Sequence, residues 1–243
     1  MSLFFASLLG SALNSVAGGG SFFTFPTLIF AGVPILNANA TSTMALLPGS
    51  ISNAYLYRHS KGGYYANLIP LISVSVAGSI FGTILLIYTP PHALKTVLPY
   101  LLLFATLLLI FKNRIAQSRW SQIIGENKSY ALAFQFFIAI YGGYFGGGIG
   151  ILMLATFNLM GFKDLVQMNG LKAWLGSSIN VVALIIFIAK DLIVWRYALI
   201  MVAGSLLGGY LGFLFGTKVP TKILHGFIVT VGLALTVYFF FKS

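Results

Sequence analysis

The sequence lacks cysteine and is poor in charged residues. Only 7% of its 243 residues are Asp, Glu, Lys or Arg, whereas a soluble globular domain carries about 25% charged residues. This shortage of charge excludes a soluble fold. The absence of cysteine excludes disulfide bonds and any thiolate site for a metal or for redox chemistry.

Acidic residues are the scarcest charged type, with three Asp and Glu against 14 Lys and Arg. All three fall near the ends of expected helices, so no carboxylate is available at membrane depth for a proton relay. His59, His92 and His225 are far apart in the sequence and have no nearby carboxylate for a metal site or a catalytic dyad. We therefore expect neither an enzyme nor a bound cofactor or metal.

Long runs without charge fill most of the chain. The first run covers residues 1–57, and the others are 62–94, 96–111, 129–162, 173–189, 197–217 and 223–241. Membrane-spanning helices take roughly 17–25 residues, and helices satisfy their own backbone hydrogen bonds in lipid. We therefore expect an all-α, multi-pass membrane helix bundle. Its eight helical elements are expected at 3–31, 36–57, 65–88, 94–111, 130–160, 165–189, 194–216 and 222–241.

The basic residues lie mostly between the apolar runs. In a membrane protein such an excess of positive charge, +11 over the whole chain, sets the topology and contacts anionic lipid. We therefore expect membrane lipids as partners and no nucleic acid. The sequence does not define an oligomeric state, and a homo-oligomer is compatible with it.

The two halves of the chain resemble each other. Three landmarks recur in the same order at spacings of 126 to 128 residues: glycines 18–20 and 146–148, Ser50 with Asn53 and Ser177 with Asn180, and the segments 76–82 and 202–208. A duplication explains this order, and internal repeats are common in secondary transporters. We expect a first membrane repeat over residues 1–111, a hydrophilic connecting loop at 112–129 and a second membrane repeat over 130–243.

Each glycine triplet divides its apolar element into two pieces of about 12 to 15 residues, which are too short to cross a core of about 30 Å. The pieces could fold back as a re-entrant hairpin, which makes the repeats inverted, or continue as one broken span, which makes them parallel. Both arrangements place nine Lys and Arg on one side and four on the other, with Lys172 left out. Inverted repeats are favoured because they point two half-helix ends at each other.

The glycine triplets are the first candidate site. Glycine lets the backbone unwind, and the helix that restarts after each triplet presents free N–H groups and a positive dipole end. This combination favours binding of an anion at membrane depth. A single triplet is as easily a kink or a close helix crossing, but paired glycine interruptions in two halves are typical of a transport site.

The second candidate site lies on the helices that follow the triplets, which carry many polar residues. Asn169 and Asn180 are eleven residues apart and share nearly one helix face, with Lys172 about a quarter turn away. Lys172 lies about 10 Å into its helix, where an ionisable residue is usually functional, although it could snorkel or pair with Asp164. The candidate substrate-binding residues are Asn14, Gly19, Gly20, Ser21, Thr43, Ser50, Asn53, Gly147, Gly148, Asn169, Lys172, Ser177 and Asn180.

Several segments resemble the TauE/SafE (YfcA-like) sulfite exporter family. In the first half these are Ala17-Gly18-Gly19-Gly20-Ser21, Gly32-Val33-Pro34 and Leu46-Leu47-Pro48-Gly49-Ser50-Ile51-Ser52-Asn53. In the second half the stretch from Lys172 to Asn180 is similar to that family's lysine-to-serine-asparagine segment. Asn14 departs from the pattern, because the YfcA-like branch is expected to carry an acidic residue there.

The resemblance implies export of sulfite or a small organosulfur anion, such as a sulfonate, across a bacterial inner membrane. We expect a secondary transporter that works by alternating access around a central site with a small anionic substrate. The alternatives are an uptake carrier for a cation or a neutral metabolite, and a structural or enzymatic membrane subunit.

Overall fold

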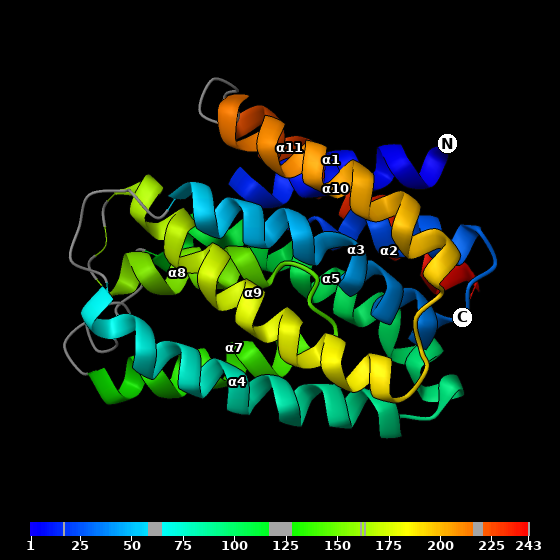
Figure 1. Cartoon of the computed structure of the whole chain (residues 1–243), viewed down its shortest axis with the longest axis horizontal. Coiled ribbons are helices and arrows are strands. Elements are labelled where there is room, and N and C mark those ends of the chain that lie inside the picture. The colour runs from blue at the N-terminus through cyan, green and yellow to red at the C-terminus, as the bar shows by residue number, and fades with distance from the viewer. Residues whose placement is uncertain are drawn as a thin grey trace.

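The computed structural model describes residues 1–16, 18–57, 65–116, 128–160, 162, 164–215 and 221–242. All regular elements in these ranges are α-helices, so the expected all-α bundle is confirmed. They are α1 (Ser2–Val16), α2 (Ser21–Phe30), α3 (Ile35–Leu56), α4 (Tyr65–Tyr88), α5 (Pro91–Ala116), α7 (Lys128–Tyr144), α8 (Ile149–Leu159), α9 (Leu165–Ala189), α10 (Trp195–Phe215) and α11 (Thr221–Lys242). Both chain termini lie near one end of the bundle, which we call the terminal end (Figure 1).

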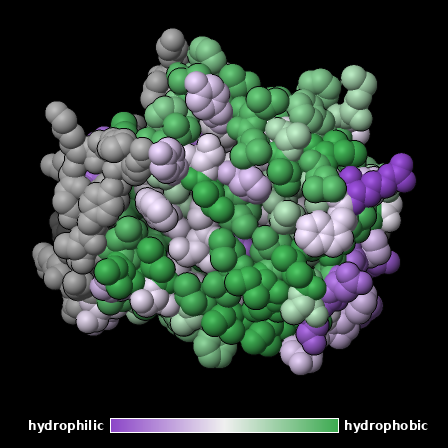
Figure 2. Space-filling model, viewed as in Figure 1, coloured by the Kyte–Doolittle hydropathy of each residue, from purple (hydrophilic) through white to green (hydrophobic). Residues whose placement is uncertain are grey.

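Four of the described helices are long and apolar enough to cross a membrane. These spans are Leu68–Tyr88, Pro91–Phe111, Val166–Ala189 and Trp195–Phe215. Large apolar side chains such as Ile69, Ile185 and Leu199 are exposed on their outer faces, and Figure 2 shows hydrophobic residues over much of one side of the molecule. Because water does not favour so much exposed apolar surface, these faces are suited to lipid, and the protein is a multi-pass membrane protein.

The expected elements 3–31 and 130–160 are each split into two helices at the glycine triplet. In the first hairpin, a Cβ built on Gly10 of α1 would lie 3.3 Å from the Thr24 side chain of α2, so α2 folds back along α1. In the second hairpin, Met160, just after α8, packs against Ala131 near the start of α7. We call these pairs the first hairpin (α1 and α2) and the second hairpin (α7 and α8).

The first helix of each hairpin packs on a long helix from the other half of the chain. Gly204, Gly208 and Gly212 of α10 lie against the α1 backbone at successively later positions, so α1 and α10 run parallel. The helices α7 and α4 are paired in the same way, and Gln135 of α7 donates a 2.9 Å hydrogen bond to Ser75 of α4. Glycine permits these close backbone approaches.

Two further helix pairs are antiparallel. The Asn37 side chain near the start of α3 donates a 3.0 Å hydrogen bond to the carbonyl of Leu192, which follows α9, so α3 and α9 run in opposite directions. In the α5–α11 pair the rings of Tyr100 and Phe240 lie 5.1 Å apart, while Thr106 lies against Gly232. This arrangement brings the starts of α3 and α5 and the end of α11 to the terminal end.

The helix boundaries differ from the expected ones mainly around the connection between the halves. The structure extends α5 to Ala116 and begins α7 at Lys128, so the ends of the expected 112–129 loop are helical. Residues 117–127 of that loop lie outside the described residues.

Candidate functional site

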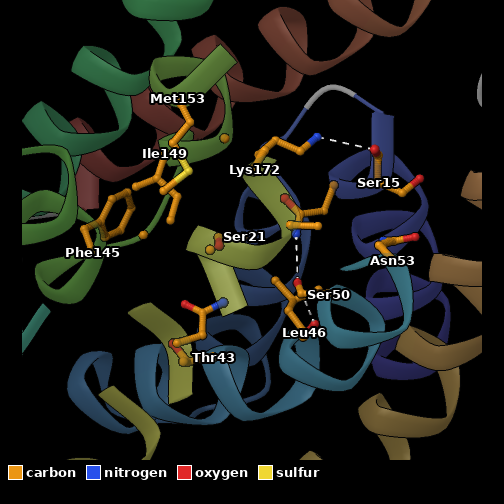
Figure 3. Close-up of a pocket in the computed structure, with 16 residues that line it drawn as sticks. Ser15, Ser21, Thr43, Leu46, Ser50, Asn53, Phe145, Ile149, Met153 and Lys172 are labelled. Atoms are coloured by element: carbon orange, nitrogen blue, oxygen red, sulfur yellow. Dashed lines mark hydrogen bonds between the residues drawn. The ribbon is translucent and has the colours of Figure 1, made fainter. Parts of the chain in front are cut away.

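Four helix ends meet inside the bundle. The helix α1 ends at Val16 and α2 begins at Ser21, while α7 ends at Tyr144 and α8 begins at Ile149. A cavity lies where these ends meet, and α3 and α9 complete its wall (Figure 3). Its lining residues are Asn14, Ser15, Ser21, Thr43, Leu46, Ser50, Asn53, Phe145, Gly146, Ile149, Gly150, Met153, Lys172, Ala173, Gly176 and Asn180.

The cavity, which we call the central cavity, is small. It offers about 50 Å³ to the centres of water-sized molecules, and one water needs roughly 10–15 Å³ on this measure. The space therefore suits a few waters, or a solute of about four or five heavy atoms. A large metabolite does not fit in this conformation.

Lys172 of α9 is the one charged side chain among the described residues that line the central cavity. It is only 5% exposed. Its Nζ donates hydrogen bonds to Asn169 Oδ1 at 2.7 Å and to the carbonyl of Ser15 at 3.3 Å. An ammonium group has three donors, so these two partners leave one N–H for a ligand.

The positive charge of Lys172 is stabilised without an acidic partner in the described part of the chain. Ser15 lies in the last turn of α1, where the helix carbonyls form the negative end of the helix dipole. A helix end and an amide oxygen compensate a buried ammonium only in part, since they carry partial charges. The central cavity is therefore electropositive beside Lys172.

One wall of the central cavity is polar. Asn14 Nδ2 donates to Ser50 Oγ at 3.3 Å, and Ser50 Oγ donates to the Leu46 carbonyl at 3.1 Å. Asn53 is 3% exposed, and its Oδ1 has no hydrogen-bond partner among the described residues. A buried polar atom without a partner is unfavourable by roughly 1–3 kcal/mol, so a water or a bound solute is expected to contact the Asn53 amide.

The opposite wall is apolar. Figure 3 shows Phe145, Ile149 and Met153 of the second hairpin across the cavity from Ser50 and Asn53. A solute in the central cavity is therefore held by polar groups and Lys172 on one side, and by an aromatic ring and aliphatic groups on the other.

The tips of the two hairpins touch beside Lys172. A Cβ built on Gly18, whose φ is +82°, would lie 3.0 Å from the Cα of Gly150. A Cβ on Gly150 would lie 3.1 Å from Cδ of Lys172. Glycine suits this contact, because a Cβ at either position would require the neighbouring atoms to shift by a few tenths of an ångström, and at Gly18 a side chain would also have to adopt a left-handed backbone conformation.

The structure brings most of the candidate residues together. Those that line the central cavity are Asn14, Ser21, Thr43, Ser50, Asn53, Lys172 and Asn180. Asn169 is not in the lining, but its side chain accepts the hydrogen bond from Lys172. The candidates that lie elsewhere are Gly19, Gly20, Gly147, Gly148 and Ser177.

These five residues are packed against other parts of the bundle and do not line the cavity. Gly19 faces Phe22 and Ile228, and Gly20 packs on Gly10 of α1. Gly147 lies against the ring of Phe145, and Gly148 faces Ala105 of α5. Ser177 is buried, and its hydroxyl has no partner among the described residues. The triplets therefore contribute mainly by shaping the hairpins that border the cavity.

Nine lining residues were not among the candidates named from the sequence: Ser15, Leu46, Phe145, Gly146, Ile149, Gly150, Met153, Ala173 and Gly176. Gly146 belongs to the second glycine triplet, although it was not singled out as a binding residue, and Gly150 lies two residues after that triplet. Ser15 contributes its backbone carbonyl. Because every residue has a backbone carbonyl, the residue type does not indicate this role. Phe145 is one of 22 phenylalanines, and only its position distinguishes it.

A multi-pass helix bundle with a polar cavity between interrupted helices has the architecture of a membrane transporter. Sequence comparison agrees with this class. The chain belongs to the TauE/SafE sulfite exporter family, whose model matches residues 3–239.

Relatives of the chain carry transporter names. It is 29% identical to the probable membrane transporter protein ORF9 of Sinorhizobium sp. over 97% of this chain and 90% of the relative. It is 26% identical to the probable membrane transporter protein YfcA of Escherichia coli strain K12 over 99% of this chain and 89% of the relative. No solved structure matches the chain. The protein is therefore a membrane transporter and not an enzyme.

Proposed function

We propose that the protein is a secondary transporter that exports a small anion, sulfite or a small organosulfur anion such as a sulfonate, by alternating access around the central cavity. The observation that carries this proposal is the buried Lys172, which lines the cavity with no acidic partner in the described residues. Family membership supports the same substrate class.

The cavity favours an anion with a single negative charge. Lys172 supplies one positive charge, and its hydrogen bonds to Asn169 and Ser15 leave one donor for the substrate. A second negative charge would be buried without a counter-ion, which is strongly unfavourable. The volume suits about four or five heavy atoms, the size of hydrogensulfite or a one-carbon sulfonate.

The helix directions support two inverted repeats, 1–111 and 130–243. Under the sequence match α3 corresponds to α9 and α5 to α11, and each of these pairs is antiparallel. In the same match α1 corresponds to α7, and α10 corresponds to α4. The α1–α10 pair therefore corresponds to the α7–α4 pair, and the helices of both pairs are close and parallel. A two-fold axis in the membrane plane relates helices in this way.

The charge distribution supports an orientation. At the end opposite the terminal end, the joining segments together with the adjoining helix ends carry nine Lys and Arg, whereas four belong to the terminal end. The positive-inside rule then places the terminal end outside the cytoplasm. An inside-negative potential favours export of a monovalent anion by about 2.3 kcal/mol per 100 mV.

Flux in liposomes that contain only this protein tests the proposal. We expect saturable uptake or counterflow with methanesulfonate and, at a pH where hydrogensulfite predominates, with sulfite, and much weaker flux with the dianions sulfate and thiosulfate. A neutral solute and a monovalent cation should not be transported. Transport of the neutral solute or the cation, without transport of any anion, would overturn the proposal.

A further inference from the structure

A second cavity lies between the second hairpin and the terminal end. It is lined by parts of α2, α3, α4, α5 and α7 and by Phe145. Ile35, the first residue of α3, and Leu94, near the start of α5, belong to its wall, so it extends toward the terminal end. It offers about 10 Å³ to the centres of water-sized molecules, and its other lining residues are mostly apolar. We call it the apolar cavity.

Phe145 is the residue that the central cavity and the apolar cavity have in common. Its side chain is 6% exposed. Along α3, the residues that line the central cavity run from Thr43 to Asn53, while those that line the apolar cavity are Ile35 and Asn39. The two cavities thus follow one another along the helix, with the Phe145 ring between them.

The ring of Phe145 is seated by neighbours from both hairpins. It makes an edge contact with Phe25 of α2, with ring centroids 5.6 Å apart, and a second with Tyr141 of α7 at 6.3 Å. A Cβ on Gly147 would lie 2.5 Å from Cε1 of Phe145. The space for the ring therefore depends on glycine at position 147.

Hydrogen bonds hold the hairpin tip on each side of the ring. The Tyr141 hydroxyl donates to the carbonyl of Gly147 at 2.8 Å, and Asn39 Nδ2 donates to the carbonyl of Tyr144 at 3.0 Å. Both bonds can break and reform without a change in covalent structure. The backbone beside the ring is permissive, because Gly146 adopts a φ of +76° at little cost.

We propose that the Phe145 side chain is the barrier between the central cavity and the apolar cavity, and that it must move aside for a solute to reach the terminal end. The inference rests on transport through the central cavity but on no particular substrate. The ring closes the path with an apolar surface that a hydrated anion does not cross. Its displacement, with the tip of the second hairpin, opens the path toward the terminal end.

Cysteine accessibility tests this barrier without any transported solute, so its outcome is separate from the substrate proposal. Because the chain lacks cysteine, Ala173→Cys reports on the central cavity and Leu98→Cys on the apolar cavity. Labelling of Ser2→Cys identifies the vesicles in which the terminal end of the protein faces the medium. A small, impermeant, anionic methanethiosulfonate reagent is then added to those vesicles.

We expect Phe145→Ala to raise the rate of Ala173→Cys modification from the terminal end about tenfold or more, and Phe145→Trp to keep it at the parent rate. Leu98→Cys should react at the same rate in the Phe145→Ala and Phe145→Trp backgrounds. The matched control is Phe137→Ala, which removes an exposed ring from α7, the helix that ends just before Phe145, and should change neither rate.

Two results would overturn the proposal. One is an Ala173→Cys rate in Phe145→Ala that equals the parent rate. The other is an equal increase in Phe137→Ala. Modification of Ala173→Cys in inverted vesicles serves as the check of folding. If Phe145→Ala fails that check, Phe145→Leu is measured in its place, and its expected result is a smaller increase in the same direction.

Discussion

At the scale of single residues, Lys172 connects the two halves of the chain. It belongs to α9, yet one of its two hydrogen-bond acceptors is the carbonyl of Ser15 at the end of α1. The other acceptor, Asn169, is on its own helix. An anion on the third N–H of Lys172 would therefore bind directly beside this contact between α9 and the first hairpin.

Lys172→Met is expected to reduce anion transport by about 10- to 100-fold, because a hydrogen bond to a charged group contributes roughly 1.5–3 kcal/mol. Expression and folding should remain near normal, since methionine has a similar volume and tolerates a buried position. The measurement is initial flux in liposomes at equal protein density. Lys190→Met, at the exposed end of the same helix, is the control. Unchanged transport in Lys172→Met would remove the binding role from this residue.

Asn169→Asp is expected to weaken anion binding at least about tenfold, which corresponds to about 1.4 kcal/mol. A carboxylate in place of the Asn169 amide would pair with the ammonium at 2.7 Å and neutralise the charge that attracts the substrate. The concentration for half-maximal flux is the measured quantity. If Lys172 were only structural, this ion pair would leave that concentration unchanged and raise thermal stability.

At the scale of elements, the hairpins were the part that the sequence predicted best. The glycine triplets predicted a break in each long apolar element, and both helices end there. The partners of the hairpins could not be predicted, because most residues on every face of these helices are apolar. The four-residue spacing of Gly204, Gly208 and Gly212 is typical of a close helix contact, but nothing in that spacing identifies α1 as the neighbour.

The positions of individual side chains at the tips were also beyond the sequence. Asn14 and Ser21 line the central cavity, whereas Gly19 and Gly20, between them in the chain, do not. Where the backbone leaves the helical path, the 3.6-residue periodicity that relates neighbours no longer applies. Phe145 precedes the second triplet and was missed for the same reason.

Gly18→Ala is expected to abolish most transport, and Gly32→Ala to preserve it. Both glycines have left-handed φ values, +82° and +83°, so alanine destabilises each by roughly 1–2 kcal/mol. A Cβ on Gly18 would also lie in tight contact with Gly150, 3.0 Å from its Cα, whereas nothing lies within 4 Å of a Cβ on Gly32. Thermal unfolding in detergent and liposome flux together separate backbone strain from loss of the tip contact. Equal flux in the two variants would argue against a role for that contact.

At the scale of the whole molecule, composition alone predicted a multi-pass helical membrane protein, and the apolar helices confirm it. The relative direction of the two halves could not be obtained from composition, because loop charge divides nine to four in either arrangement. The helix contacts support the inverted arrangement that we propose. They place Met1 and the start of α3 at the same end of the bundle.

Single cysteines at Ser2 and Ile35 are therefore expected to have equal accessibility to an impermeant maleimide added outside intact cells. The orientation that we infer from the loop charges places both cysteines outside the cytoplasm, so both should react in intact cells and not only after lysis. Lysed cells give the total amount of each reactive thiol. Opposite accessibility of the two positions would mean that α1 and α2 form one broken span, and would contradict inverted repeats.

The pairing of α1 with α10 also has a consequence for synthesis. Helix α1 ends at Val16, and its partner α10 begins at Trp195, so the ribosome adds 178 residues between them. At about 5–20 residues per second this takes roughly 9–36 seconds. During that time α1, a short helix without charged residues, lies in or at the membrane without α10, on which it packs in the folded protein. The nascent chain thus has a period in which insertion factors or proteases can act on its first hairpin.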